Sequence, residues 1–241
     1  MSKEVKLNLG AGICLLKGFV GVDAFLTKEQ IIEGWTTKQG GCMNAIVQLE
    51  DDGSYPEYVT ADICSMPFKD GSCDYALMDN VIEHLPMRNL FPALKEVRRV
   101  LKPSGKILII TPDFNAMCKV WMEHIASKVG SFQDWGLFHN CAEVFYGNQA
   151  GEGEYHRSPM TPDLLNHLLL LAGFENVMVH CHPVNNPVPS YDGNMCPPEA
   201  MLRNDTLFAG ATVPMPVVEE SPGGELKINV GDATQVKGGL R

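Results

Sequence analysis

Val5-Lys6-Leu7-Asn8-Leu9-Gly10-Ala11-Gly12 and, a few residues later, Phe19-Val20-Gly21-Val22-Asp23 are the two stretches that decide the fold. The first is a short apolar run that ends in closely spaced glycines, and the second ends in a carboxylate. This pattern predicts a strand, a tight turn and a second strand with an acid at its tip. Glycine permits positive φ and close ligand approach, and an acid so placed accepts hydrogen bonds from a ribose diol. We therefore expect a nucleoside-bearing cofactor at the carboxyl edge of a parallel sheet.

The spacing of this turn narrows the choice of cofactor. The dinucleotide fingerprint needs glycine or alanine where this chain has Leu15, and it places the acid about 20 residues on. Here Asp23 follows Gly10 by only 13 residues. A phosphate loop ending in Gly-Lys-Ser/Thr is also absent from the sequence. A cofactor with a ribose and no pyrophosphate fits better, and S-adenosylmethionine is the clearest candidate. The alternative is a plain βαβ turn with a chance acid.

Composition bounds the class of protein. The chain has 241 residues with 45% hydrophobic and 20% charged content, which suits one domain with an appendage. The net charge of −10 argues against a long electrostatic footprint on DNA or RNA. The expected partner is therefore a small-molecule or surface-exposed acceptor, and the oligomeric state stays open.

The sequence also carries signals about the cellular setting. Residues 1–4 lack the charged-then-apolar build of a signal peptide, and no apolar run approaches the length of a membrane span. The eight cysteines include no Cys-x-x-Cys pair, and most lie in apolar runs, where cysteine acts as a small hydrophobe. A reduced, cytoplasmic location without membrane contact is the expectation.

Strands and helices alternate along the rest of the chain. The connection at 13–18 is too short for a full crossover helix and is expected to make at most one or two helical turns. Helical patterns lie near 31–35 and at 90–101, 115–128 and 161–172, the last with Thr161 as cap and Pro162 in the first turn. Further strands are predicted at 55–59, 73–78, 106–111, 174–180 and 206–213.

The expected fold class is therefore α/β, with a Rossmann-like, doubly wound, mostly parallel seven-stranded sheet and a final antiparallel strand. Residues 1–213 form this domain. Within it, 24–54 are expected to be an insertion or lid and 130–160 a substrate-side segment. Residues 214–241 are expected to be a Pro/Gly-rich tail outside the core, with 226–230 as an alternative added strand.

The order of these motifs resembles the class I S-adenosylmethionine-dependent methyltransferases, and in particular the methyltransferase type 11-like proteins with a shortened first crossover. The resemblance covers about residues 5 to 180, and it lies in the order and spacing of the motifs. The matching motifs are Leu7-Asn8-Leu9-Gly10-Ala11-Gly12, Gly18-Phe19-Val20-Gly21-Val22-Asp23, Ala61-Asp62-Ile63, Pro67-Phe68, Ser72-Cys73-Asp74, Glu83-His84-Leu85 and the run 96–106.

This resemblance implies cofactor contacts position by position. The backbone at Gly10, Ala11 and Gly12 would approach the methionine part, and Asp23 would hold the ribose. Asp62 and Ile63 would flank the adenine, while Asp79 and Val81 would lie near the sulfonium. Two positions depart from the pattern, because Asn8 replaces the usual acid and Cys14 replaces a common third glycine. Asn8 can still accept a hydrogen bond from the cofactor amine, but without the charge.

Methyl transfer from a sulfonium is an in-line displacement in which orientation alone can supply much of the barrier reduction. A base is needed only when the acceptor must lose a proton. His84, His139 and His156 are the candidates because histidine titrates near working pH. Tyr155 and Arg157 are candidate substrate contacts, with Arg157 able to clamp an acidic group.

No metal site is expected from the sequence. His180-Cys181-His182 is the nearest to one, but adjacent ligands on a strand point to opposite faces. The predicted function is methyl transfer from S-adenosylmethionine to an unidentified acceptor. A cofactor-binding or scaffold protein that keeps the fold without turnover is the alternative. A nicotinamide oxidoreductase is a third hypothesis, which Leu15 and the short spacing oppose.

Overall fold

The structure is a computed structural model of the 241-residue chain. It describes residues 4–37, 46–125, 142–149, 151–181, 206–215, 217–220 and 226–229.

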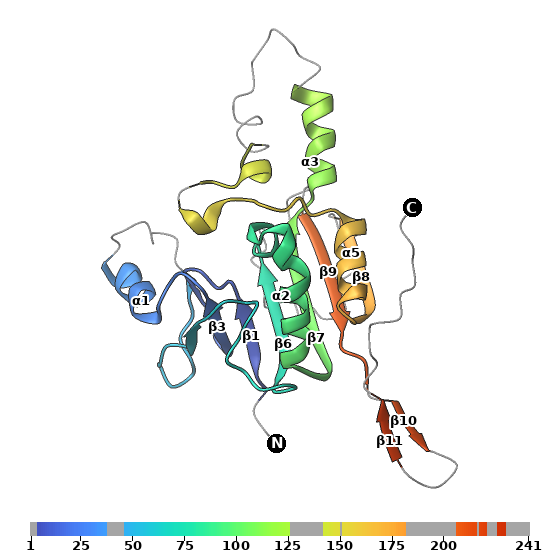
Figure 1. The fold of residues 1–241 in the computed structure, drawn as a ribbon. Helices are drawn as coiled ribbons and strands as arrows, with labels where there is room; N and C mark the ends of the chain where they lie inside the picture. Colours follow the sequence, from blue (N-terminus) through green and yellow to red (C-terminus); the bar gives the residue numbers. More distant parts are fainter. Residues whose placement is uncertain are drawn as a thin grey trace.

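The centre of the fold is a seven-stranded sheet in the order β5-β3-β1-β6-β7-β9-β8 (Figure 1). The five strands from β5 to β7 are mutually parallel, while β9 runs antiparallel to both β7 and β8. The predicted mostly parallel sheet with a final antiparallel strand is therefore confirmed. Its strands are β1 (Lys6–Leu9), β3 (Phe19–Asp23), β5 (Tyr58–Thr60), β6 (Cys73–Asp79), β7 (Leu101–Pro112), β8 (Glu175–Cys181) and β9 (Thr206–Thr212).

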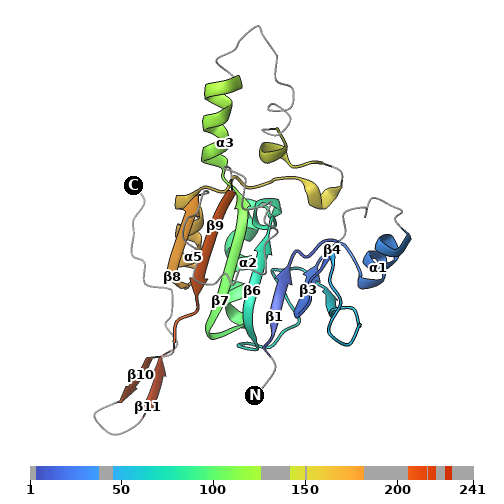
Figure 2. The ribbon, with the colours of Figure 1, turned by 180° about the vertical axis from the view of Figure 1, so that it is seen from behind.

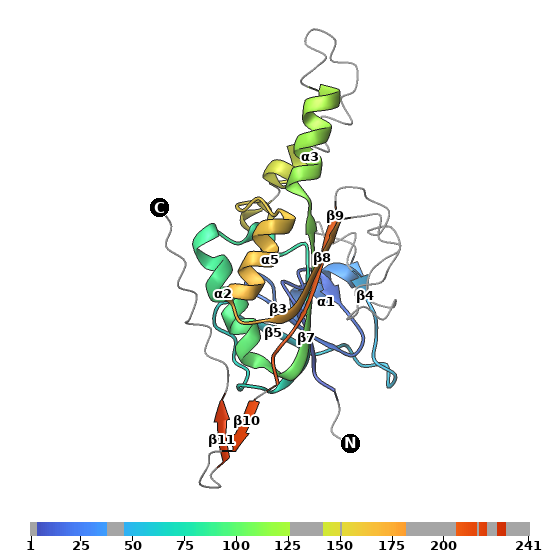
Figure 3. The same cartoon turned by 90° about the vertical axis from the view of Figure 1, so that its right-hand side faces the viewer.

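Two helices cover one face of this sheet, as Figures 1 and 3 show. These are α2 (Met87–Val100) and α5 (Pro162–Leu171). Their buried leucines and valines join Leu7, Leu9 and Ile109 of the sheet in the main core. A smaller cluster that includes Phe19, Tyr75 and Leu77 lies on the other face, which Figure 2 shows from behind. The helix α1 (Lys28–Thr37) lies on the side of the sheet where β3 and the edge strand β5 are found.

The first connection differs from the expected helical turns. Residues 13–18 contain the two-residue strand β2 (Cys14–Leu15), which pairs in parallel with β4 (Ile46–Val47). The backbone of this segment therefore finds its hydrogen bonds across space, from Gln48 N to Leu15 O among others. The parallel pairing therefore joins the first connection to the later part of the expected 24–54 insertion.

The structure differs from the sequence expectations at the ends of two helices and in the expected tail. The helix α2 ends at Val100, and β7 begins at once at Leu101, so the Pro-Ser-Gly run lies inside the strand. The helix α3 (Phe114–Val120) continues as a π-helical turn (Trp121–Ile125). Within the expected tail, β11 (Leu226–Asn229) corresponds to the alternative strand at 226–230, and it forms an antiparallel hairpin with β10 (Val217–Glu220), which was not expected.

Several segments of the chain lie over the carboxyl edge of the sheet. The helix α3 stands above this edge, capped by the Asp113 side chain, which accepts from the backbone N–H groups of Asn115 and Ala116. The segments 142–149 and 151–160 pass over the same edge (Figures 1 and 2). No helix in the described part of the chain has the length and apolar character to cross a bilayer.

Gly10 gives a direct test of the close packing between the turn after β1 and Val81, the second residue after β6. Its φ is +61°, and a Cβ there would lie 2.5 and 2.6 Å from two methyl carbons of Val81. We expect Gly10→Ala to lower the free energy of unfolding by at least about 1 kcal/mol, because positive φ alone costs that much. In urea unfolding, the double variant with Val81→Ala should lose less than the two single losses added together. Strict additivity would show that the contact with Val81 is not what excludes a side chain.

Candidate active site

The glycine turn after β1 is fixed from two sides at a single residue, Gly12. The Asp23 carboxylate accepts a hydrogen bond from the Gly12 N–H at 3.0 Å, and the Tyr58 hydroxyl donates to the Gly12 carbonyl at 3.0 Å. Asp23 also accepts from the N–H groups of Phe25 and Leu26 at 2.8 and 3.3 Å. The carboxylate at the tip of β3 therefore faces the glycine turn, as a ribose-binding acid must.

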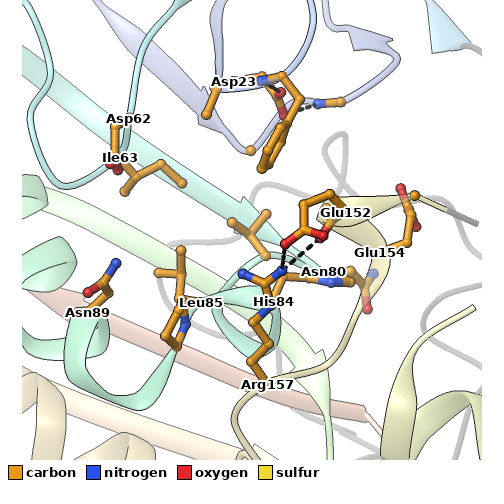
Figure 4. A pocket seen from close by; sticks show the side chains of 18 of the residues that line it. Asp23, Asp62, Ile63, Asn80, His84, Leu85, Asn89, Glu152, Glu154 and Arg157 are labelled. Atoms are coloured by element: carbon orange, nitrogen blue, oxygen red, sulfur yellow. Dashed lines mark hydrogen bonds and ion pairs between the residues drawn. The ribbon is translucent and has the colours of Figure 1, made fainter. Parts of the chain in front are cut away.

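Above this turn lies a pocket of about 690 Å³. Figure 4 shows Asp23 and Asp62 on one side of it and His84, Glu152 and Arg157 on the other. The polar groups thus converge from both sides on one space, as in a small-molecule site. The lining residues are Gly10, Gly12, Asp23, Ala24, Phe25, Leu26, Asp62, Ile63, Asn80, Val81, His84, Leu85, Pro86, Arg88, Asn89, Gly151, Glu152, Gly153, Glu154 and Arg157.

Asp62 and Ile63 form one wall just after β5. The Ile63 side chain is buried, while Asp62 is exposed and uses one carboxylate oxygen to accept from the Cys64 N–H at 2.8 Å. This turn holds an apolar surface and an acceptor side by side. Such a pair suits the face and the amino group of a purine.

Most of the cofactor residues expected from the sequence line the pocket, and three do not. Asn8, Ala11 and Asp79 are absent from its wall. Asn8 is buried in β1, and Ala11 is buried in the turn, where its N–H donates to Val22 O. After β6 it is Asn80, at a φ of +51°, that reaches the pocket in place of Asp79.

Sequence reasoning missed Glu83 as a separate group. It lies in the 3-10 helix η1 (Ile82–His84), which follows β6, and its side chain is 2% exposed. One carboxylate oxygen accepts from the Thr111 hydroxyl at 2.9 Å, and among the described residues the other has no partner. Burial raises the pKa of Glu83 to about 8. The sequence signal was an acid surrounded by apolar residues in Val81-Ile82-Glu83-His84-Leu85.

The structure brings His84 and His156 together. Their ring centroids are 4.7 Å apart in an edge-on arrangement. The Nδ1 atom of His84 lies 3.2 Å from the Tyr155 carbonyl oxygen, and that of His156 lies 2.7 Å from the Val144 carbonyl oxygen. Because a carbonyl only accepts, each Nδ1 carries a proton in these contacts, and each Nε2 keeps its lone pair when the ring is neutral. Burial and the neighbouring His156 lower the pKa of His84.

Of the other residues predicted on the acceptor side, one lines the pocket, one does not, and one lies outside the described residues. The Arg157 guanidinium pairs with Glu152, also drawn in Figure 4, and it lines the pocket. Tyr155 contributes its carbonyl to His84, but its side chain is 41% exposed and outside the pocket wall. His139 lies outside the described residues. A second space of about 230 Å³, lined by Glu83, His156 and Arg157 with several aromatic side chains, adjoins the first at Arg157.

Asp79 provides a pH test of the strand end. Burial raises its pKa to about 6 despite a hydrogen bond from Asn80, so the folded state holds the proton more tightly than the unfolded chain. Stability is therefore lost as the pH rises from about 4 to above 6. Compared with the isosteric Asp79→Asn variant, the wild-type protein should lose up to about 3 kcal/mol over this window in urea unfolding. A difference between the two proteins that does not change with pH would contradict the assignment.

Comparison with known proteins finds similarity to a methyltransferase domain over part of the chain. A model of the methyltransferase domain matches residues 38–109. This segment contains β5, β6, α2 and part of β7, while the glycine turn and Asp23 lie outside it.

An uncharacterized protein of Methanocaldococcus jannaschii is 36% identical over 86 residues, which cover 36% of this chain and 33% of that protein. An uncharacterized transposon protein of Streptomyces fradiae is 30% identical over 82 residues, which cover 30% of this chain and 23% of the relative. The matches thus span a third or less of these curated relatives.

A solved structure agrees with the fold over nearly the whole chain. It is a SAM-dependent methyltransferase from Methanosarcina mazei, with a TM-score of 0.50 and 17% identity. The alignment covers 89% of this chain and 95% of that one. At this identity the likeness concerns the fold alone. An argument about function therefore has to come from the residues of the pocket described above.

Proposed function

We propose that this chain is a class I methyltransferase of the type 11-like group, which binds S-adenosylmethionine and transfers its methyl group to an acceptor by in-line displacement; its fold and its matched domain segment support this proposal. The observation that carries the proposal is the Asp23 carboxylate, which faces the glycine turn at the edge of the larger pocket.

The residues around the pocket support a specific placement of the cofactor. Gly10 and Gly12 offer bare backbone at positive φ for the methionine part. Asp23 has two oxygens with about four acceptor sites, of which backbone N–H groups use three. The ribose diol therefore shares the Asp23 carboxylate with the backbone N–H groups that this carboxylate already holds. Asp62 and Ile63 then hold the adenine at the far wall.

The acceptor would approach from the opposite side of the pocket. His84, Glu152 and Arg157 lie there in Figure 4, across from Asp23 and Asp62. Catalysis would come mainly from orientation, because a sulfonium methyl is already activated. Because Arg157 is already paired with Glu152, an acidic acceptor would have to displace that carboxylate to use the guanidinium. The catalytic roles of His84, His139 and His156 stay predictions, as does a cytoplasmic location.

A non-catalytic cofactor-binding protein is the second candidate. Asn8 and Cys14 depart from the residues that the family places at those positions. Asn8 is buried and does not line the larger pocket. The replacement of the family's acid by this uncharged residue therefore does not change the charge of the groups that line the pocket.

Cofactor affinity tests the role of Asp23. Calorimetry with S-adenosylhomocysteine should show binding weakened by roughly 1–3 kcal/mol in Asp23→Ala, since ribose hydroxyls lose their acceptor. Asp23→Asn keeps the size and one acceptor oxygen and should fall between this variant and the wild type. Asp163→Asn, an exposed acid on α5, serves as the control. Unchanged affinity in Asp23→Ala would remove this residue from the site.

Turnover separates the enzyme from the scaffold. The protein is incubated with S-adenosylmethionine labelled on its methyl group and with small-molecule and macromolecular fractions of a cell extract. An enzyme yields labelled product that is lost in Asp23→Ala. Tight binding of S-adenosylhomocysteine without any transfer would favour the scaffold, and binding of NAD in its place would favour an oxidoreductase.

A further inference from the structure

The cluster of Glu83, His84 and His156 has no assigned role in cofactor binding. One ligand atom from each residue, a ring nitrogen or a carboxylate oxygen, lies within 4.8 Å of the other two. The cluster lies where the two pockets approach each other, because His84 lines the larger space and the other two residues line the smaller one.

Backbone contacts hold the cluster together. The N–H groups of Arg157 and Ser158 both donate to the Glu83 carbonyl, at 2.8 and 3.0 Å, and the Ser158 hydroxyl donates to the Leu85 carbonyl. The His156 N–H donates to the Tyr146 carbonyl. The segment that carries His156 is thus fastened to η1, and the three side chains are brought together by pairings that do not involve a ligand.

We propose that Glu83, His84 and His156 form a binding site for a divalent transition metal ion, with Zn²⁺ as the first candidate. Both histidines donate Nδ1–H to a backbone carbonyl, which is how proteins orient metal-binding imidazoles and leave Nε2 for the ion. The two hydrogen bonds to backbone carbonyls use the Nδ1 atoms and leave the Nε2 atoms outside these contacts.

The carboxylate of Glu83 supplies an independent observation. It is buried, Thr111 holds one of its oxygens, and the other oxygen has no partner within the described part of the chain. Burying such a group is costly unless it is hydrogen-bonded or coordinates a metal. A cation held by the free oxygen and two imidazoles would satisfy it.

The donor set selects the kind of metal. Two imidazoles and one carboxylate suit Zn²⁺ and related first-row ions, whereas Mg²⁺ and Ca²⁺ prefer all-oxygen sites. In tetrahedral zinc sites the ligand atoms lie roughly 3.3 Å apart, so these side chains would move inward by about 1 Å on binding. Three protein ligands leave one position open at the junction of the two spaces. Metal binding would occupy the Nε2 lone pairs and so replace a general-base role for either histidine.

Zinc affinity tests the site without reference to methyl transfer. The full chain is titrated with Zn²⁺ in competition with a chromogenic chelator. We expect one ion per chain in the wild type and affinity lowered at least about tenfold in His84→Ala, His156→Ala and Glu83→Gln. His167→Ala, an exposed histidine on α5, should match the wild type. Thr111→Val should weaken binding less than loss of a ligand, and Thr111→Ser should restore it.

Folding and cofactor binding are measured on the same variants. If the buried Glu83→Gln does not fold, the two histidine variants, whose rings are only partly buried, decide the question. Equal zinc binding by all variants would mean an adventitious ion only, and no binding by the wild type would also overturn the proposal. Binding of S-adenosylhomocysteine depends on Asp23 and its neighbours, so failure of one proposal is distinguishable from failure of the other.

Discussion

The backbone of Gly12 is the constraint on which the proposed cofactor site depends. Its N–H is held by Asp23 of β3 and its carbonyl by Tyr58 of β5, so the turn that follows β1 is tied to the two neighbouring parallel strands at one residue. Tyr58 can reach this position because Gly21 has no side chain, since a Cβ there would lie 2.4 Å from the tyrosine ring. The same contacts shape the turn and aim the carboxylate at the space above it.

The shortened first connection fits this arrangement. A crossover helix between β1 and β3 would cover the region beside the turn, and here a two-residue strand takes its place. The two-stranded β2–β4 sheet then satisfies backbone groups that a helix would have paired internally. The second side of the pocket comes from distant sequence. The N–H groups of Arg157 and Ser158 donate to the Glu83 carbonyl of η1, and the Arg157 guanidinium pairs with Glu152.

Much of the fold and part of the pocket wall could be predicted from local patterns. The apolar runs of β1, β6 and β7, the Thr161 cap and the acid at the tip of β3 are short-range signals, and each appears in the structure. Tyr58 and Glu83 could not be predicted, because their roles depend on burial and on partners 46 and 28 residues away, Gly12 and Thr111. The approach of His84 to His156 likewise depends on tertiary pairing, although each residue was a candidate separately. The β10–β11 hairpin was underestimated because a Pro/Gly-rich composition usually indicates a tail.

The central claim is that this turn and its carboxylate form a pocket for an adenosyl sulfonium. A crystal structure of the chain with S-adenosylhomocysteine tests it most directly. The account predicts the ribose diol within hydrogen-bond distance of the Asp23 carboxylate, the methionine part over Gly10 and Gly12, and the adenine against Ile63. A ligand bound elsewhere, or a ribose without contact to residue 23, would contradict it.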